Sequence, residues 1–140
     1  MGRDERSEAG AVAAAAVLYF AVVFAVGFVL GTVRVLLVVP VLGERPAELI
    51  ELPVMIAASY FAAGWVLRRS SRVLSFAGAA LAGVLALALL VATELTLVLL
   101  LRGITLSRYL AERDRVAGMA YLAALLIFGA LPGWLAHRAR

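Results

Sequence analysis

Four ionisable residues lie within or against long apolar runs of the sequence, and their types could support proton or cation chemistry. They are one base, Arg34, and three acids, Glu48, Glu51 and Glu94. An isolated charge inside a bilayer costs about 2.5–3.5 kcal/mol on insertion scales, so such residues normally pair or line a wet cavity. Arg34 with Glu51 or with Glu94 is the natural pair. A carboxylate left over beside lipid would carry protons or bind a cation.

Two of these residues also have purely structural interpretations. Glu48 lies in the first helical turn after Pro46, where a carboxylate suits the positive end of the helix dipole. Arg34 could instead extend its guanidinium to the lipid headgroups. No cap or helix end lies near Glu94, so for this residue a position that faces the other helices is favoured.

Membrane-spanning helices are needed to position these residues. With 65% apolar and 16% charged residues, the chain is far more apolar than soluble domains, which average about 45–50% and about 25%. A chain of this size cannot bury so much hydrocarbon, so the excess must face lipid. The apolar runs are continuous and lack the alternation of barrel strands, which favours helices. The expected spans are 11–39, 47–67, 73–101 and 116–136, after a polar N-terminal tail at residues 1–10.

Short connections between these runs predict antiparallel neighbours. We therefore expect an all-α, polytopic, antiparallel four-transmembrane-helix bundle that forms one domain over residues 1–140. A short interfacial helix is expected between helices three and four, capped by Ser107, with an ion pair between Arg108 and Glu112. In this layout the four membrane charges fall at the same end of the bundle. Residues expected to flank them are Ser59, Arg102, Tyr109, Arg113 and Asp114.

Small residues at helical spacing predict where helices pack closely. Gly27 and Gly31 form a Gly-x-x-x-Gly pair, and Ser75, Ala79 and Gly83 form a ladder on the third span. A stripe of this kind also occurs by chance in glycine-rich spans.

The remaining composition excludes several classes of protein. All 13 basic residues are Arg, and they stand in short clusters beside apolar runs. This pattern serves bilayer topology and anionic headgroups, so we expect the lipid bilayer and no nucleic acid as a partner. The absence of Cys excludes disulfides and thiolate metal sites. We see no catalytic constellation and expect no metal and no cofactor. A small excess of Arg on the side of the termini favours cytoplasmic termini in the inner (plasma) membrane.

Through residues spread over nearly its whole length, the chain resembles a group of small bacterial four-span membrane proteins with no established activity. The resemblance implies a topology and no chemistry. The small multidrug transporters share the length and span count, but their essential carboxylate lies in the first helix, where this chain has Arg34. The residues that carry the resemblance are Gly31-x-x-Arg34, Pro40, Gly43, Glu51-x-Pro53, Ser59, Glu94, Leu101-Arg102-Gly103, Tyr109, Arg113-Asp114 and Tyr121.

Three functions fit these features. The first is an accessory or partner-binding membrane protein, whose charge cluster docks another protein or a second copy in a homodimer or larger complex. The second is a subunit of a small homo-oligomeric proton- or cation-coupled transporter or channel, with Arg34 as the counter-charge to Glu51 and Glu94. The third is a lipid-modifying enzyme that uses Glu51 and Glu94 as acid and base. No nucleophile with a base is present, so enzyme activity is the least favoured.

Overall fold

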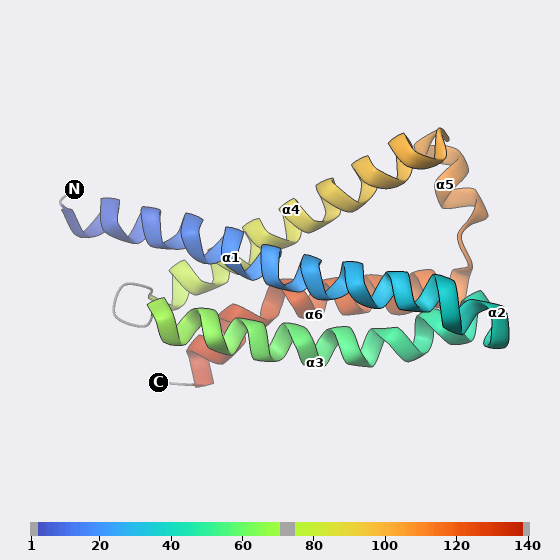
Figure 1. The fold of residues 1–140 in the computed structure, drawn as a ribbon. Coiled ribbons are helices and arrows are strands. Elements are labelled where there is room, and N and C mark those ends of the chain that lie inside the picture. The colour runs from blue at the N-terminus through green and yellow to red at the C-terminus, as the bar shows by residue number, and fades with distance from the viewer. Residues whose placement is uncertain (1–2, 71–74, 139–140) are drawn as a thin grey trace.

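Helices account for all the regular structure that the described part of the chain contains (Figure 1). A computed structural model describes residues 3–70 and 75–138 and, within them, all side chains except those of residues 3–7, 70 and 102. The elements are α1 (Arg3–Val33), a π-helical turn η1 (Arg34–Val38), α2 (Val39–Leu42), α3 (Glu44–Ser70), α4 (Phe76–Arg102), α5 (Leu106–Glu112) and α6 (Arg115–Arg138).

In the described part of the chain, four helical segments are long and apolar enough to cross a membrane, as the hydropathy pattern predicted. They are Glu8–Leu42, Glu44–Arg69, Phe76–Leu101 and Arg115–Arg138. Large apolar side chains cover their outer surfaces, and Leu101 and Phe61 are 81% and 71% exposed. Exposed hydrocarbon on this scale is typical of helices that face lipid.

The beginning of the first helix differs from the sequence prediction. Residues 1–10 were expected to form a polar tail, but α1 already begins at Arg3. The acidic, basic and alanine residues of this segment are good helix formers, which explains its helical state. The predicted start of the third span at residue 73 lies outside the described residues, and α4 begins at Phe76 with Ser75 as its N-cap.

The first span does not continue as one α-helix to its end. The N–H of Val39 donates to the carbonyl of Arg34, which is the spacing of a π-helix. Pro40 follows and has no N–H to donate, so it cannot restore the α-helical register at that point. Gly43 then adopts φ +89°, which favours glycine, and ends α2. As a result α3 begins at Glu44, earlier than the expected residue 47.

Each long helix packs along two of the others, in the pairs α1–α3, α1–α4, α3–α6 and α4–α6. In Figure 1 both termini lie at one end; α1 and α4 run away from that end, and α3 and α6 return to it. The prediction that short loops join neighbours holds for α1–α3 and α4–α6. By contrast, α3 and α4 pack on α1 and α6 rather than along each other. The five residues between them can reach about 17 Å, which exceeds the roughly 14 Å diagonal of helices packed about 10 Å apart.

The buried core lies in the half of the molecule near the termini. Tyr19 is 1% exposed, its ring stacks on Phe128 with centroids 4.3 Å apart, and its hydroxyl donates to the Phe128 carbonyl at 2.6 Å. Small residues from α3 and α4 surround this pair, so this half is tightly packed. The other core residues are Val12, Ala15, Ala16, Val23, Ala62, Ala63, Val66, Ala82, Ala86, Leu90 and Leu131.

Two helices approach most closely at glycines of α4 and α6. A Cβ atom on Gly83 would meet the carbonyl oxygen of Gly129 and the ring of Pro132, so only glycine fits there. This agrees with the packing role predicted for Gly83, and Ala79 is also fully buried. The α6 side of the contact was not predicted.

The predicted glycine pair on the first helix behaves differently. A Cβ atom on Gly27 would meet only the flexible end of Met55 from α3. At Gly31 the sole described side chain within 4 Å is that of Arg34, so no other helix approaches there. The close helix contact expected at Gly31 is therefore not formed; the residue lines the cavity described below.

The Gly83 contact predicts a loss of stability when a side chain is added. Gly83→Val should lower the free energy of unfolding by about 1–3 kcal/mol, because α4 and α6 must separate to admit the new atoms. Thermal unfolding in detergent micelles, followed by circular dichroism, measures this change. Gly10→Val is the matched control, since a Cβ there has open space. Equal melting temperatures for the two variants would contradict the contact.

Candidate functional site

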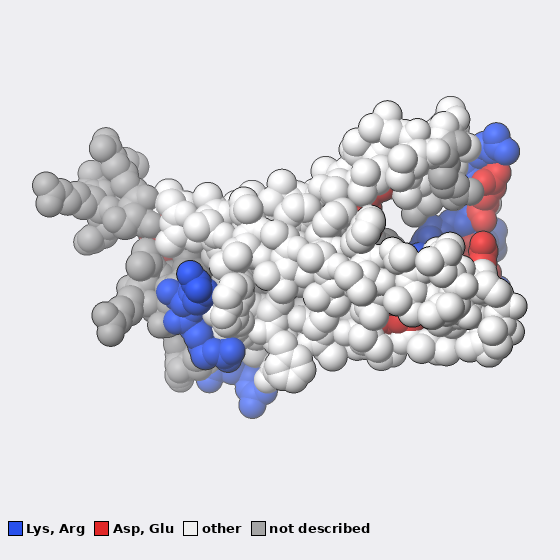
Figure 2. Space-filling view, in the orientation of Figure 1, with Lys and Arg blue, Asp and Glu red and all other residues white. Residues whose placement is uncertain are grey.

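A cavity of about 330 Å³ lies where α4 diverges from the other helices, at the end far from the termini (Figure 1). Figure 2 shows the hollow between the α4–α5 part of the molecule and the rest, with charged side chains in its depth. Apolar and aromatic side chains form most of the lining, including Val23, Phe24, Phe28, Leu52, Ile56, Leu90, Leu97, Leu125 and Phe128.

The four membrane charges identified in the sequence all line this cavity. Arg34 comes from η1, Glu48 and Glu51 come from successive turns of α3, and Glu94 comes from α4. A fifth charge, Arg113, joins them from the segment between α5 and α6. The lining therefore combines an apolar interior with charges contributed by η1, α3, α4 and the segment between α5 and α6.

Arg34 and Glu51 form the ion pair that the sequence suggested as one of two alternatives. Arg34 Nη1 lies 2.6 Å from Glu51 Oε2, and the two side chains are 32% and 13% exposed. The guanidinium therefore points to α3 and does not extend away from the helices. The pair fixes the end of α1 against the first half of α3.

Glu48 pairs with Arg113, which sequence reasoning had placed only among the flanking residues. The Arg113 guanidinium donates to the Glu48 carboxylate and also lies over the ring of Tyr121, 5.0 Å from its centroid. Glu48 therefore has a tertiary partner in addition to its favourable place in the first turns of α3. The pair ties the α5–α6 connection to α3, and the only sequence signal for it was the charged step Arg113-Asp114.

Asp114 forms a second link at the outer edge. Arg45 binds its carboxylate through two bonds, Nη2 to Oδ1 at 2.5 Å and Nε to Oδ2 at 3.0 Å, while Oδ2 accepts from the Ala117 N–H at 2.9 Å and so caps α6. The Arg45 hydrogen bonds, and after them the one from Ala117, lower the pKa of Asp114. The link therefore stabilises the fold above the ordinary pKa of Asp, and this stability is lost as the pH falls through the lowered value.

Glu94 is the exception among these charges. It makes no hydrogen bond or ion pair with any described residue, although Arg34, Glu51 and Arg113 line the same cavity. The cavity holds two bases and three acids, and each base already has its own acid. One carboxylate is left without a partner among the described side chains, and the sequence predicted such a surplus without naming the residue.

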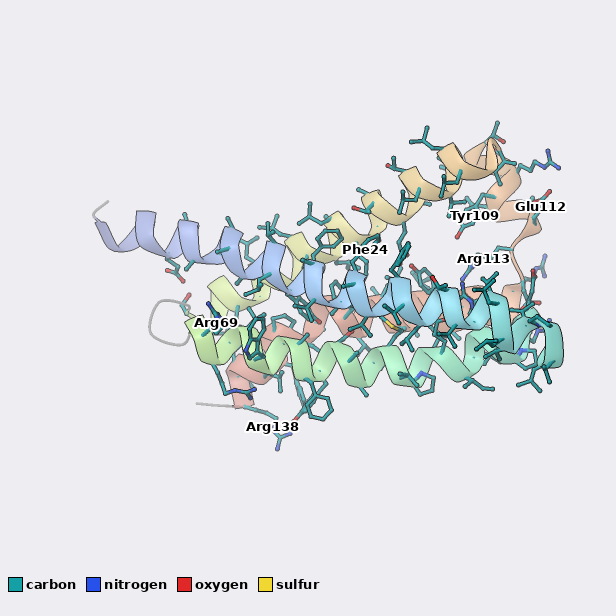
Figure 3. The ribbon with its side chains drawn as sticks, viewed as in Figure 1. Phe24, Arg69, Tyr109, Glu112, Arg113 and Arg138 are labelled. Carbon is teal, nitrogen blue, oxygen red and sulfur yellow. The ribbon has the colours of Figure 1, made fainter. Side chains whose placement is uncertain are left out.

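Of the remaining residues that were expected to flank the charges, Ser59 and Tyr109 line the cavity. Ser59 is 4% exposed, lines the cavity and donates its hydroxyl to the Met55 carbonyl at 2.8 Å. Tyr109 lines the cavity from α5 and projects toward the hollow (Figure 3). The side chain of Arg102 lies outside the part of the chain that the structure describes.

The short helix α5 forms as predicted, with a different cap. Thr105, and not Ser107, accepts the Arg108 N–H at 3.2 Å. Gly103 adopts the αL conformation and Thr105 is extended, so the helix begins directly after Thr105. Ser107 therefore lies inside the first turn. The predicted pair of Arg108 with Glu112 is confirmed at 2.8 Å.

A second, more polar cavity of about 290 Å³ adjoins the first at the end of the bundle. The two cavities share Arg34, Glu48, Tyr109 and Arg113 in their linings, so these residues lie at the boundary between an apolar interior and a polar mouth. The mouth is completed by Val35, Val39, Glu44, Arg45, Glu112, Asp114 and Ala117.

The contact of Glu48 with Arg113 predicts a measurable coupling between the two side chains. Glu48→Gln and Arg113→Gln should each destabilise the protein, because each leaves a partly buried charge without its partner. In a double-mutant cycle the two changes should couple by about 1–3 kcal/mol. The exposed Arg108–Glu112 pair, treated in the same way, should show no measurable coupling. Additive effects at residues 48 and 113 would show that the pair does not form.

Neither a family model nor a curated protein nor a solved structure matches this chain. The similarity to small four-span membrane proteins therefore stays a prediction. Among the described residues, no group of three or more His, Cys, Asp or Glu is placed to hold a metal ion. The geometry of the cavity is therefore the basis for proposing a function.

Proposed function

We propose that the protein is a multi-pass inner-membrane protein whose antiparallel four-helix bundle binds a small amphipathic cation in the cavity. The observation that carries this proposal is the carboxylate of Glu94, which has no ion-pair partner among the described residues and lies in an otherwise apolar and charge-paired cavity. A ligand with one positive charge would complete the balance of charges. Its apolar body would replace lipid or water against the hydrocarbon side chains.

The lining supports this ligand class in two further ways. Phe24, Phe28, Tyr109 and Tyr121 line the cavity, and aromatic faces attract cations, most strongly in a water-poor site. The volume of about 330 Å³ lies at the lower end of the roughly 300–1,000 Å³ typical of small-molecule sites. An anion would instead face Glu94, with both arginines already occupied by Glu48 and Glu51.

The orientation follows from the arginine distribution. We place the termini in the cytoplasm, because seven of the 13 arginines of the sequence fall on the side of the termini and six on the other side. The cavity would then open toward the outer side of the membrane. Docking of another membrane protein or of a second copy, and lipid-modifying catalysis, stay as hypotheses that no contact described here favours over ligand binding.

Binding of tetraphenylphosphonium to the purified protein in neutral-lipid nanodiscs tests the proposal. The wild type should bind it saturably, and Glu94→Gln should weaken binding by about tenfold or more. The attraction of two charges about 4 Å apart, about 4 kcal/mol at an effective dielectric near 20, is only partly offset by desolvation. Tetraphenylborate has the same shape and the opposite charge, and it should not compete.

Two variants control this experiment. Glu44→Gln removes a carboxylate from the polar cavity alone and should leave binding unchanged. Gly31→Leu fills part of the apolar cavity, where a new side chain has space, and should weaken binding without removing a charge. The proposal fails if Glu94→Gln binds the cation like the wild type, or if saturable binding is absent altogether.

A second candidate is cation- or proton-coupled transport by a homo-oligomer. The shared boundary between the two cavities favours it, because the Glu48–Arg113 pair and Tyr109 separate an intramembrane site from a polar mouth. In proteoliposomes with a pH gradient, the wild type should accelerate release of tetraphenylphosphonium and Glu94→Gln should not. Binding without accelerated release would refute transport and leave the binding function intact.

A further inference from the structure

The same pairing of Trp and Arg recurs at the ends of α3 and α6. Trp65 precedes Arg69 by four residues in the last turns of α3, and Trp134 precedes Arg138 by four in the last turns of α6. In each case the guanidinium lies over the indole ring, 5.2 Å from the centroid on α3 and 5.1 Å on α6. The spacing explains the contact, since residues four apart share one face of a helix.

The two pairs lie at the same end of the molecule. The helices α3 and α6 pack together, run in the same direction and finish near the termini (Figure 1). Figure 3 places Arg69 and Arg138 at this end, and Figure 2 shows basic side chains gathered there over α3 and α6. The Trp–Arg ends of α3 and α6, defined as Trp65, Arg69, Trp134 and Arg138, thus place basic and aromatic side chains on two packed helices at one end of the molecule.

Neither Arg69 nor Arg138 forms an ion pair with a carboxylate of the described residues. This is unlike the opposite end of the bundle, where most arginines bind a carboxylate; those pairs are Arg34–Glu51, Arg45–Asp114, Arg108–Glu112 and Arg113–Glu48. Helix geometry and the cation–π contacts hold the two guanidinium groups in place, and no described carboxylate neutralises their charge.

A guanidinium held over an aromatic ring can still bind phosphate. The group has five N–H donors, and the cation–π contact uses none of them in a hydrogen bond to an oxygen atom, so they stay available to phosphate oxygens. Tryptophan rings favour the level of the lipid headgroups, which places both arginines beside lipid phosphates. An apolar surface continues into the bilayer from this point, because Phe61 lies one turn before Trp65 and is 71% exposed.

We propose that the Trp–Arg ends of α3 and α6 bind the headgroup phosphate of an anionic phospholipid, with an acyl chain along the exposed face of α3. Charge complementarity selects an anion, and the adjoining apolar surface selects a lipid over free phosphate. The site is independent of the cavity and of Glu94.

The chain offers a direct signal for this site, because Trp65 and Trp134 are its only two tryptophans. The full-length protein in neutral detergent micelles is titrated with dioctanoyl phosphatidylglycerol while the intrinsic tryptophan emission is recorded. Parallel titrations use dioctanoyl phosphatidylcholine and inorganic phosphate. We expect a saturable change with phosphatidylglycerol, weakened by added salt, and none with phosphatidylcholine or with millimolar phosphate.

Arginine variants test the assignment of the site. Arg69→Gln and Arg138→Gln should each weaken phosphatidylglycerol binding about fivefold, and the double variant by about 25-fold. The Arg→Lys pair keeps the charge and loses the planar donors, so its affinity should fall between those of the wild type and the double Gln variant. The charge-matched control is Arg45→Gln with Arg108→Gln at the opposite end, which should bind like the wild type.

Three outcomes overturn the proposal. Equal responses to phosphatidylglycerol and phosphatidylcholine would show that headgroup charge is not recognised. Equal loss in the control double variant would show attraction by net charge alone. Saturation by inorganic phosphate at the same concentrations as lipid would reveal a free-anion site. The far-ultraviolet circular dichroism of each variant, which should match the wild type, separates lost binding from lost folding.

Discussion

Ion pairing between partly buried charges organises the open end of this molecule. Two arginines and three glutamates line one cavity, and each arginine is held by one glutamate. These pairs attach the end of α1 and the α5–α6 connection to α3. Among the described side chains of α4, Glu94 is the charged one that lines the cavity, and it forms no such pair with the described residues. The helix α4 also diverges from the others there (Figure 1). The helix whose described side chains form no ion pair is therefore the one that leaves space for the cavity.

The half near the termini is organised by a different interaction. Alanines, glycines and the buried Tyr19 let the helices approach until the backbone of α6 touches α4 at Gly83. Close packing and hydrogen bonds such as that of Tyr19 to Phe128 hold these helices together. This half of the molecule is closely packed, whereas the other half contains the cavity.

The sequence was sufficient for features that depend on hydropathy and chain direction. Continuous apolar runs located the four long helices, and alternating direction brought Arg34, Glu48, Glu51 and Glu94 to one end. Pairing depends on how each helix is rotated about its axis, which hydropathy does not reveal. For that reason the Glu48–Arg113 contact was missed and the choice between Glu51 and Glu94 stayed open.

Several helix boundaries and one helix cap were predicted incorrectly, and in each case a few residues explain the difference. Charged residues at the start of α1 suggested a tail, but their helix propensity prevailed. Thr105 and Ser107 are both good caps, and the extended backbone after Gly103 decided in favour of Thr105. The π-helical turn at Arg34 precedes Pro40, and hydrophobic periodicity in the sequence does not reveal where a helical turn contains one extra residue.

Infrared difference spectroscopy on the reconstituted protein tests the central claim most directly, because it observes carboxylates themselves. Addition of tetraphenylphosphonium should perturb a carboxyl band that is missing from Glu94→Gln and intact in Glu44→Gln. A spectrum that does not respond to the cation, or a band that persists after Glu94 is replaced, would contradict the account.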